Sequence, residues 1–363
     1  MKEWIHQISK LASSLDSTLD DVREWIAQLL NIEDPFRVLP YRGYGTRDSF
    51  LVKGRVLKDE GIKLREQSSS MIDNVIKMFK RFATDEVPHA RLQVRYGSIE
   101  EIVTANQEGF FTIEISPKSQ LQEDWWRLVD ISLIEPCPKQ DSVLEQAEVL
   151  LVSDQAEFGV ISDIDDTIVH TAAFDLLKMI RIVYLGSAES RQPFEGVADF
   201  YTALQTGLGS QPQNPIFYVS SSAWNMYDVF ARFMEINHIP KGPMLLKDIE
   251  FSLESLLTFT HEAHKREQIE PILERFPELP FLLIGDSGQR DPEIYSRLVE
   301  QYPDRILAVL IRNVVPFDGW RRQELNDLGK QITAAGSQFL LFEETEQARN
   351  FAIANGWISN FSH

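Results

Sequence analysis

The chain has 363 residues, of which 43% are hydrophobic and 25% are charged, a composition typical of folded globular proteins and unlike that of disordered chains. Its 36 basic and 55 acidic residues give a formal net charge of -19 at pH 7, which disfavours nucleic acid as a partner. One cysteine excludes an internal disulfide framework. We see no signal peptide and no apolar run of about 18 residues that could span a membrane, so we expect a cytoplasmic protein without a transmembrane segment.

Residues 1–35 are predicted to form an N-terminal helical segment. Ser17 and Asp20 have the spacing of a capping box at a helix start. Apolar side chains then recur at helical spacing, at Val22, Trp25, Ile26, Leu29 and Leu30. We expect these helices to pack on the body of the protein.

Residues 36–155 are predicted to form a β-rich, sandwich-like domain. Several segments alternate between apolar and polar side chains and are separated by Gly, Asn and Asp, which favours an antiparallel sheet or sandwich. The segments expected to be strands are Phe50–Leu57, Arg91–Tyr96, Phe110–Ile115 and Trp125–Ile134. One helix is expected within this domain, over Met71–Phe82.

Residues 156–363 are predicted to form an α/β domain. Short apolar runs alternate with helical segments, which indicates a parallel sheet with helices on both faces. The apolar runs are Phe158–Ile161, Ile216–Val219, Met244–Leu246, Phe281–Ile284, Ile306–Ile311 and Phe339–Phe342. Helices are expected near Phe174–Tyr184 and Gly196–Leu204. In such a sheet, ligands bind beyond the carboxyl ends of the strands.

Carboxylates and hydroxyls follow three of these runs. Asp163 and Asp165 come after the first run, Ser220 and Ser221 after the second, and Asp286, followed by Asp291, after the fourth. Crowded carboxylates repel one another, and a divalent cation would remove that conflict. A site with oxygen ligands and few histidines favours Mg²⁺ over zinc.

These residue types suit phosphoryl transfer. One aspartate can attack phosphorus, and a second carboxylate can protonate the leaving alcohol and later activate water. Hydroxyls and a lysine can hold the phosphate oxygens, while Mg²⁺ offsets the repulsion between two anions.

The sequence resembles a known family at these positions. The strings are Ile161-Ser162-Asp163-Ile164-Asp165-Asp166-Thr167, Tyr218-Val219-Ser220-Ser221-Ser222-Ala223-Trp224-Asn225 and Gly285-Asp286-Ser287-Gly288-Gln289-Arg290-Asp291-Pro292-Glu293-Ile294-Tyr295. They are similar to the actin-patch-associated phosphatidate phosphatase family, which is related to the lipins within the haloacid-dehalogenase superfamily. The resemblance covers about residues 156–355. The segment Tyr41–Gly45 and the strands after it also look like the N-terminal β domain of this family.

The resemblance implies a role for each matching residue. Asp163 matches the nucleophile and a Mg²⁺ ligand, and Asp165 matches the general acid/base, with its backbone carbonyl on the metal. Thr167 matches a residue that supports this loop. The residues matching phosphate-binding positions are Ser220, Ser221 and Lys265, and those matching further metal ligands are Asp286 and Asp291.

Two departures from the family pattern affect these assignments. Ala223 stands where the family usually has proline, which is expected to loosen that turn. Pro271 interrupts the helix after Lys265 and is expected to kink it. Lys247 is the alternative phosphate-binding lysine if Lys265 is displaced.

The resemblance implies a Mg²⁺-dependent phosphatidate phosphatase with a haloacid-dehalogenase-like, Rossmann-like domain. Its products would be diacylglycerol and phosphate, formed through an aspartyl-phosphate. Neither Ile168–Pro215 nor Ala223–His264 is long enough for a full cap domain. An open site suits a phospholipid at a membrane surface, so peripheral membrane association is expected. Two alternatives stay open: a capless phosphatase acting on another bulky phosphomonoester, and a non-catalytic lipid-binding scaffold.

Overall fold

The computed structural model describes most of the chain. The described residues are 36–58, 86–117, 125–136, 144–165, 167–168, 194–209, 211, 213–247, 261–314 and 319–360. The helices predicted over 1–35, Met71–Phe82 and Phe174–Tyr184 lie outside them. Among the helices within these ranges, none is long and apolar enough to cross a membrane.

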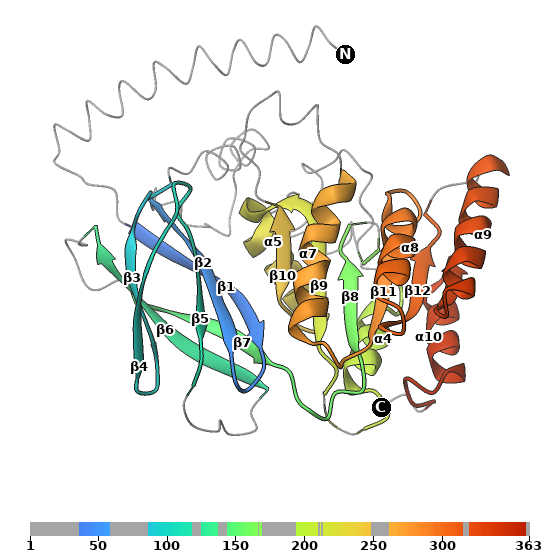
Figure 1. The fold of residues 1–363 in the computed structure, drawn as a ribbon, viewed down its shortest axis with the longest axis horizontal. Helices are drawn as coiled ribbons and strands as arrows, with labels where there is room; N and C mark the ends of the chain where they lie inside the picture. Colours follow the sequence, from blue (N-terminus) through green and yellow to red (C-terminus); the bar gives the residue numbers. More distant parts are fainter. Residues whose placement is uncertain are drawn as a thin grey trace, which may run out of the picture.

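The N-terminal part of the described chain forms a mixed sheet of seven strands, here called sheet A (Figure 1). Its strands are β1 (Phe36–Gly45), β2 (Phe50–Lys58), β3 (Arg91–Tyr96), β4 (Ile99–Thr104), β5 (Phe110–Ile115), β6 (Trp126–Glu135) and β7 (Leu144–Leu151). Their order in space is β4-β3-β6-β7-β1-β2-β5. Neighbours are antiparallel except β1 and β7, which are parallel.

The two edge strands of sheet A, β4 and β5, follow one another in sequence and are separated only by residues 105–109. Such a short connection requires the sheet to curl so that its edges approach each other. The inner face then encloses an apolar cluster that includes Val52, Leu92, Ile131 and Val149, all fully buried.

The structure confirms four of the predicted strands of sheet A and adds three that were not predicted. The added strands are β1, β4 and β7. The expected sandwich is not confirmed, because these strands form a single curled sheet. Alternation shows that one face of a strand is buried, but it does not show which strands pair.

The C-terminal part forms a parallel six-stranded sheet, here called sheet B, and all six predicted apolar runs are strands in it. The strands are β8 (Gly159–Asp163), β9 (Ile216–Ala223), β10 (Met244–Lys247), β11 (Phe281–Asp286), β12 (Ile306–Arg312) and β13 (Gln338–Phe342). Their order is β10-β9-β8-β11-β12-β13, and every neighbouring pair is parallel. The order therefore reverses between β8 and β11, the central pair of the sheet.

Helices cover both faces of sheet B (Figure 1). They are α4 (Val197–Thr206), the short 3₁₀ helix η1 (Trp224–Met226), α5 (Tyr227–Ile236), α7 (His261–Arg275), α8 (Asp291–Gln301), α9 (Gly319–Ala334) and α10 (Thr345–Ala354). One apolar cluster lies under α4, α5 and α10, and a second lies under α7, α8 and α9. This three-layer α/β arrangement confirms the coarse fold class predicted for the C-terminal part.

Strand β1 also joins the two sheets. Tyr41 belongs to the first apolar cluster of sheet B and Tyr44 to the second, and both side chains are buried. The Tyr44 ring lies 5.3 Å from the ring of Phe217 on β9, edge to face. On another element, Arg275 of α7 forms an ion pair of 2.9 Å with Glu114 of β5. Sheet A is therefore packed directly against the α/β part.

Candidate active site

Two aspartates lie where the order of sheet B reverses. Asp163 is the last residue of β8 and Asp286 is the last residue of β11, its neighbour. Asp291 opens α8, only five residues after Asp286. The strands before these aspartates are apolar and buried, so each carboxylate is delivered to the carboxyl edge of the sheet, where ligands bind in such folds. The structure thus brings three predicted site residues together.

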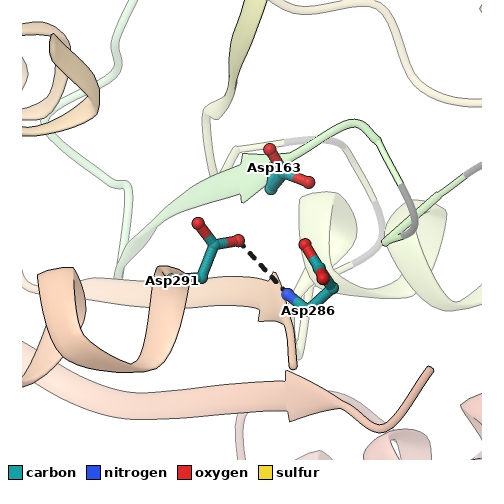
Figure 2. A group of neighbouring side chains, drawn as sticks. All are labelled: Asp163, Asp286 and Asp291. Atoms are coloured by element: carbon teal, nitrogen blue, oxygen red, sulfur yellow. Dashed lines mark hydrogen bonds between the residues drawn. The ribbon is translucent and has the colours of Figure 1, made fainter. Parts of the chain in front are cut away.

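The three carboxylates face one another in Figure 2. All three side chains are completely buried, and one carboxylate oxygen from each lies within 4.8 Å of the others. The backbone N–H of Asp286 donates to Asp291 Oδ2 at 3.2 Å, which is the dashed line in Figure 2. Three buried acids this close need a compensating positive charge.

Lys265 supplies part of that charge. Its Nζ donates to Asp163 Oδ1 at 2.6 Å and also to Asp291 Oδ1, and its side chain is only 2% exposed. Helix α7 runs from His261 to Arg275 with Pro271 inside it, so the proline does not keep Lys265 from the acidic group. Lys247 lies at the end of β10, two strands from β8.

Burial and mutual repulsion shift the protonation of this group. Burial, followed by the neighbouring acids, raises the pKa of Asp163 well above its ordinary value, although Lys265 opposes this shift. Burial and then Asp291 raise the pKa of Asp286 to about 7. Burial alone would lower the pKa of Lys265, but Asp163 and Asp291 hold it above its ordinary value, so the lysine stays charged.

The arrangement of the acids fits a divalent cation. Asp286 Oδ1 accepts hydrogen bonds from the N–H groups of Gly288 at 2.6 Å and Gln289 at 2.9 Å. Its other oxygen, Oδ2, is buried and has no hydrogen-bond partner among the residues that the structure describes. Three carboxylates facing a single ammonium leave an excess of negative charge. Such an all-oxygen donor set could hold a hard cation.

Asp165 points to a different set of partners. Its Oδ2 accepts hydrogen bonds from Ser220 Oγ at 2.7 Å and from Ser222 Oγ at 3.2 Å, and both serines lie on β9. Ser222 was not among the predicted site residues, although it follows Ser221 directly. Ser221 Oγ is buried and, within the described parts of the chain, has no hydrogen-bond partner. A hydroxyl in that position can donate to an incoming oxygen.

The turn after Ser222 has an alanine in place of the family proline. Ala223 has φ -69° and ψ 152°, and the φ angle is close to the value that a proline ring imposes. Proline could therefore be accommodated at this position, and the loosening expected from its replacement by alanine stays a prediction.

Sequence reasoning missed two residues that support the site. Arg312, the last residue of β12, donates from Nε to the Thr167 carbonyl at 3.1 Å and from Nη2 to Thr345 Oγ1 at 3.0 Å. Thr167 in turn donates to Asp163 Oδ2 at 3.2 Å, so Arg312 braces the loop that carries the candidate nucleophile. Its position directly after the apolar run Ile306–Ile311 was an available signal.

Gly285 is the second supporting residue. A Cβ atom at this position would lie 2.4 Å from Asp291 Oδ2 and 2.7 Å from Asp291 Cβ. Only glycine lets Asp291 approach the end of β11 this closely.

Comparison with known proteins finds relatives of the segment that holds this site. Residues 158–313 match the family described as the catalytic domain of phosphatidate phosphatase APP1. Phosphatidate phosphatase APP1 of Saccharomyces cerevisiae is 35% identical over 155 residues, which are 42% of this chain and 25% of the relative. An uncharacterized protein of Schizosaccharomyces pombe is 24% identical over 240 residues, 66% of this chain and 38% of that protein.

These matches differ in the share of each protein that they cover. The chain covers well under half the length of either relative. A solved structure of the Pnkp1/Rnl/Hen1 complex is 14% identical over 51% of this chain and 58% of that chain, and its TM-score of 0.30 supports no argument about fold. All the candidate site residues lie within the segment that matches the family. The likeness to the phosphatidate phosphatase APP1 catalytic domain is therefore a likeness of residues 158–313, which make up less than half of this chain.

Proposed function

We propose that this protein is a Mg²⁺-dependent phosphatidate phosphatase that releases diacylglycerol and phosphate. The observation that carries the proposal is the buried group of Asp163, Asp286, Asp291 and Lys265 at the reversal point of sheet B, inside the family segment. We propose that residues 156–363 form a haloacid-dehalogenase-like catalytic domain, preceded by the helical segment 1–35 and the β-rich domain 36–155. The strand order of sheet B supports this assignment.

The first step of the proposed reaction forms an aspartyl-phosphate. An oxygen of the Asp163 carboxylate attacks the phosphorus atom, and the bond between phosphorus and the glycerol oxygen breaks. Asp165, held by Ser220 and Ser222, gives its proton to the departing oxygen, which leaves as the hydroxyl of diacylglycerol. Ser220, Ser221 and Lys265 would hold the phosphate oxygens.

The second step restores the enzyme. Asp165, now a carboxylate, takes a proton from a water molecule whose oxygen attacks phosphorus, and the bond between phosphorus and Asp163 breaks. Phosphate leaves, and both aspartates return to their starting states. Asp163, Asp286 and Asp291, with the backbone carbonyl of Asp165, would hold Mg²⁺. The ion would neutralise charge that builds up on the phosphate.

We propose that the enzyme acts at a membrane surface as a peripheral protein of the cytoplasm. Trp320, near the start of α9, is 68% exposed. The adjacent Arg321 donates to the carbonyls of Ser287 at 3.3 Å and Gln289 at 3.2 Å, in the loop between Asp286 and Asp291. Trp320 is therefore next in sequence to a residue that contacts this loop, and tryptophan is well suited to the boundary between lipid and water.

Phosphate release from phosphatidate in mixed micelles tests the reaction. The wild type is compared with Asp163→Asn, in Mg²⁺ and in EDTA, alongside a soluble aryl phosphate. Asp304→Asn is the control, since this exposed turn residue has φ 63°, which asparagine tolerates. We expect Mg²⁺-dependent release that prefers the lipid and is lost only in Asp163→Asn. Activity on the soluble phosphate alone would contradict the lipid substrate, and full activity of Asp163→Asn would contradict the mechanism.

Sedimentation with vesicles of phosphatidylcholine and phosphatidate tests the membrane surface. We expect Trp320→Ala to bind the vesicles several-fold more weakly and to raise KM for micellar lipid while hydrolysis of the soluble phosphate is unchanged. Leu128→Ala is the matched control, because Leu128 is 56% exposed but lies on sheet A. Equal vesicle binding by both variants would contradict the role of Trp320.

A further inference from the structure

The turn that holds Asp165 continues directly into a segment that touches sheet A. Strand β9 ends at Ala223, and η1 and α5 follow without a gap. Neither η1 nor α5 has a side-chain hydrogen bond capping its N-terminus. The position of Ser220 and Ser222 therefore depends on what anchors the residues just after them.

Aromatic rings of sheet A pack on this segment. The Tyr41 ring of β1 stacks on Trp224 with centroids 4.3 Å apart and planes 24° apart, and it lies 4.7 Å from the Tyr227 ring. The backbone N–H of Arg42 donates to the Tyr227 hydroxyl at 2.9 Å. Phe110 of β5 lies 6.3 Å from Trp224. These contacts hold the segment in place laterally, and they come from residues outside the family segment 158–313.

Arg55 adds a directional contact to this packing. Its Nη1 donates to Asn225 Oδ1 at 2.9 Å, across the boundary between the two sheets. Its other groups are bound within sheet A: Nη2 donates to Glu86 Oε1 at 2.9 Å and Nε to the Glu108 carbonyl at 2.8 Å. The Arg55 guanidinium carbon also lies 4.2 Å from the centroid of the Phe110 ring.

Burial makes this contact rigid. Arg55 is only 7% exposed, and hydrogen bonds to a charged guanidinium are stronger than neutral ones. Among the described residues, two of the three hydrogen bonds of Arg55 fix its guanidinium to Glu86 and Glu108, and the third fixes Asn225, three residues after Ser222. Any displacement of Asn225 would move the serines that hold the Asp165 carboxylate.

We propose that Arg55 is a positioning residue for the Ser220–Ser222 turn, and that the working catalytic unit therefore includes sheet A and not only residues 158–313. The proposal rests on the function proposed above for Asp165. Misplacing a catalytic group by about 1 Å can lower the rate by about 10²-fold. Because the turn orients the acid/base, loss of the contact should lower kcat more than it changes KM.

Variants of Asn225 test the proposal with the smallest disturbance. Asn225→Ala removes the acceptor of the Arg55 hydrogen bond, and Asn225→Asp retains an oxygen there. We expect Asn225→Ala to lower kcat by roughly 10- to 100-fold with KM within about threefold, and Asn225→Asp to restore most of the loss. Combining Asn225→Ala with Arg55→Met should cost no more than the stronger single change, because both remove the same contact. Arg91→Met is the control, since Arg91 pairs with Glu135 on sheet A and is 43% exposed.

Amide hydrogen exchange gives a readout that does not depend on activity. We expect faster exchange in peptides covering 220–226 in Asn225→Ala, restored in Asn225→Asp and unchanged in Arg91→Met. Unchanged kcat, or unchanged exchange at 220–226, would overturn the proposal. If the wild type hydrolysed no phosphomonoester, the proposed function would fail, while the exchange comparison would still decide whether Arg55 holds the turn.

Discussion

Replacing Lys265 by methionine should expose the electrostatic conflict in the acidic site. Methionine fills a similar volume but removes the ammonium that contacts Asp163 at 2.6 Å and also binds Asp291, where both acids are 1% exposed. Removing one partner of such a buried ion pair costs about 3–5 kcal/mol of the free energy of unfolding. We expect a loss of this size in EDTA at pH 8. The loss should be smaller at pH 5.5, because the raised pKa values of Asp163 and Asp286 let the acids take up protons.

Urea unfolding followed by tryptophan fluorescence measures this loss. Saturating Mg²⁺ should reduce the difference between Lys265→Met and the wild type, because the cation binds the folded state and compensates the same carboxylates. Lys247→Met serves as the comparison, since Lys247 is also buried at a strand end, on β10, two strands from β8. A loss in Lys265→Met that is the same in EDTA and in Mg²⁺ would refute the electrostatic account of the site.

Three further predictions concern the same site. Asp165→Asn should lower turnover, measured by phosphate release, by roughly 10²–10⁴-fold. Circular dichroism should show no loss of folded protein. Near-normal turnover would exclude Asp165 as the acid/base. Gly285→Ala should displace Asp291 and lower kcat by at least about 10-fold. Gly209→Ala is the control and should leave kcat unchanged, because a Cβ atom there meets nothing closer than 3.5 Å. Equal kcat values for the two variants would show that Asp291 can move without consequence. Asp286 has a pKa raised to about 7 from an ordinary value of 3.8, so between these values the folded state holds a proton that the unfolded state has lost. In EDTA this group's stabilisation, up to about 4 kcal/mol, should therefore be present below about pH 4 and be lost progressively as the pH rises to 7. Mg²⁺ should therefore raise Tm more at pH 8 than at pH 5, and an equal rise at both pH values would contradict this linkage.

The sequence allowed the α/β sheet to be predicted well because its strands are buried on both faces. Such strands are short continuous apolar runs, and the polar residue after each run marks the edge where ligands bind. Asp163 and Asp286 were identified in this way, and the structure places them on adjacent strands. The roles assigned to them came from the family resemblance and stay predictions.

Features that depend on pairing between distant segments were not predictable. Strand β4 lies at the edge of sheet A and is mostly half-buried or exposed, so its apolar pattern is weak. The contact between Arg55 and Asn225 joins residues 170 positions apart, and no local pattern signals it. Likewise, the sequence placed Ser220 and Ser222 two positions apart in one segment but could not show that both hydroxyls contact Asp165.

The parallel pairing of β1 with β7 has a consequence for synthesis of the protein on the ribosome. Gly43–Gly45 of β1 pair with Val149–Leu151 of β7, and the nearby ion pair between Arg42 and Glu148 spans 106 residues. At typical translation rates, β1 waits roughly 5–20 s for its partner strand to emerge. Throughout this interval Tyr41 and Tyr44 of β1 also lack their later ring partners in the α/β part, Trp224 and Phe217. Nascent chains stalled before residue 144 should accordingly depend on chaperones far more than chains stalled after the last strand.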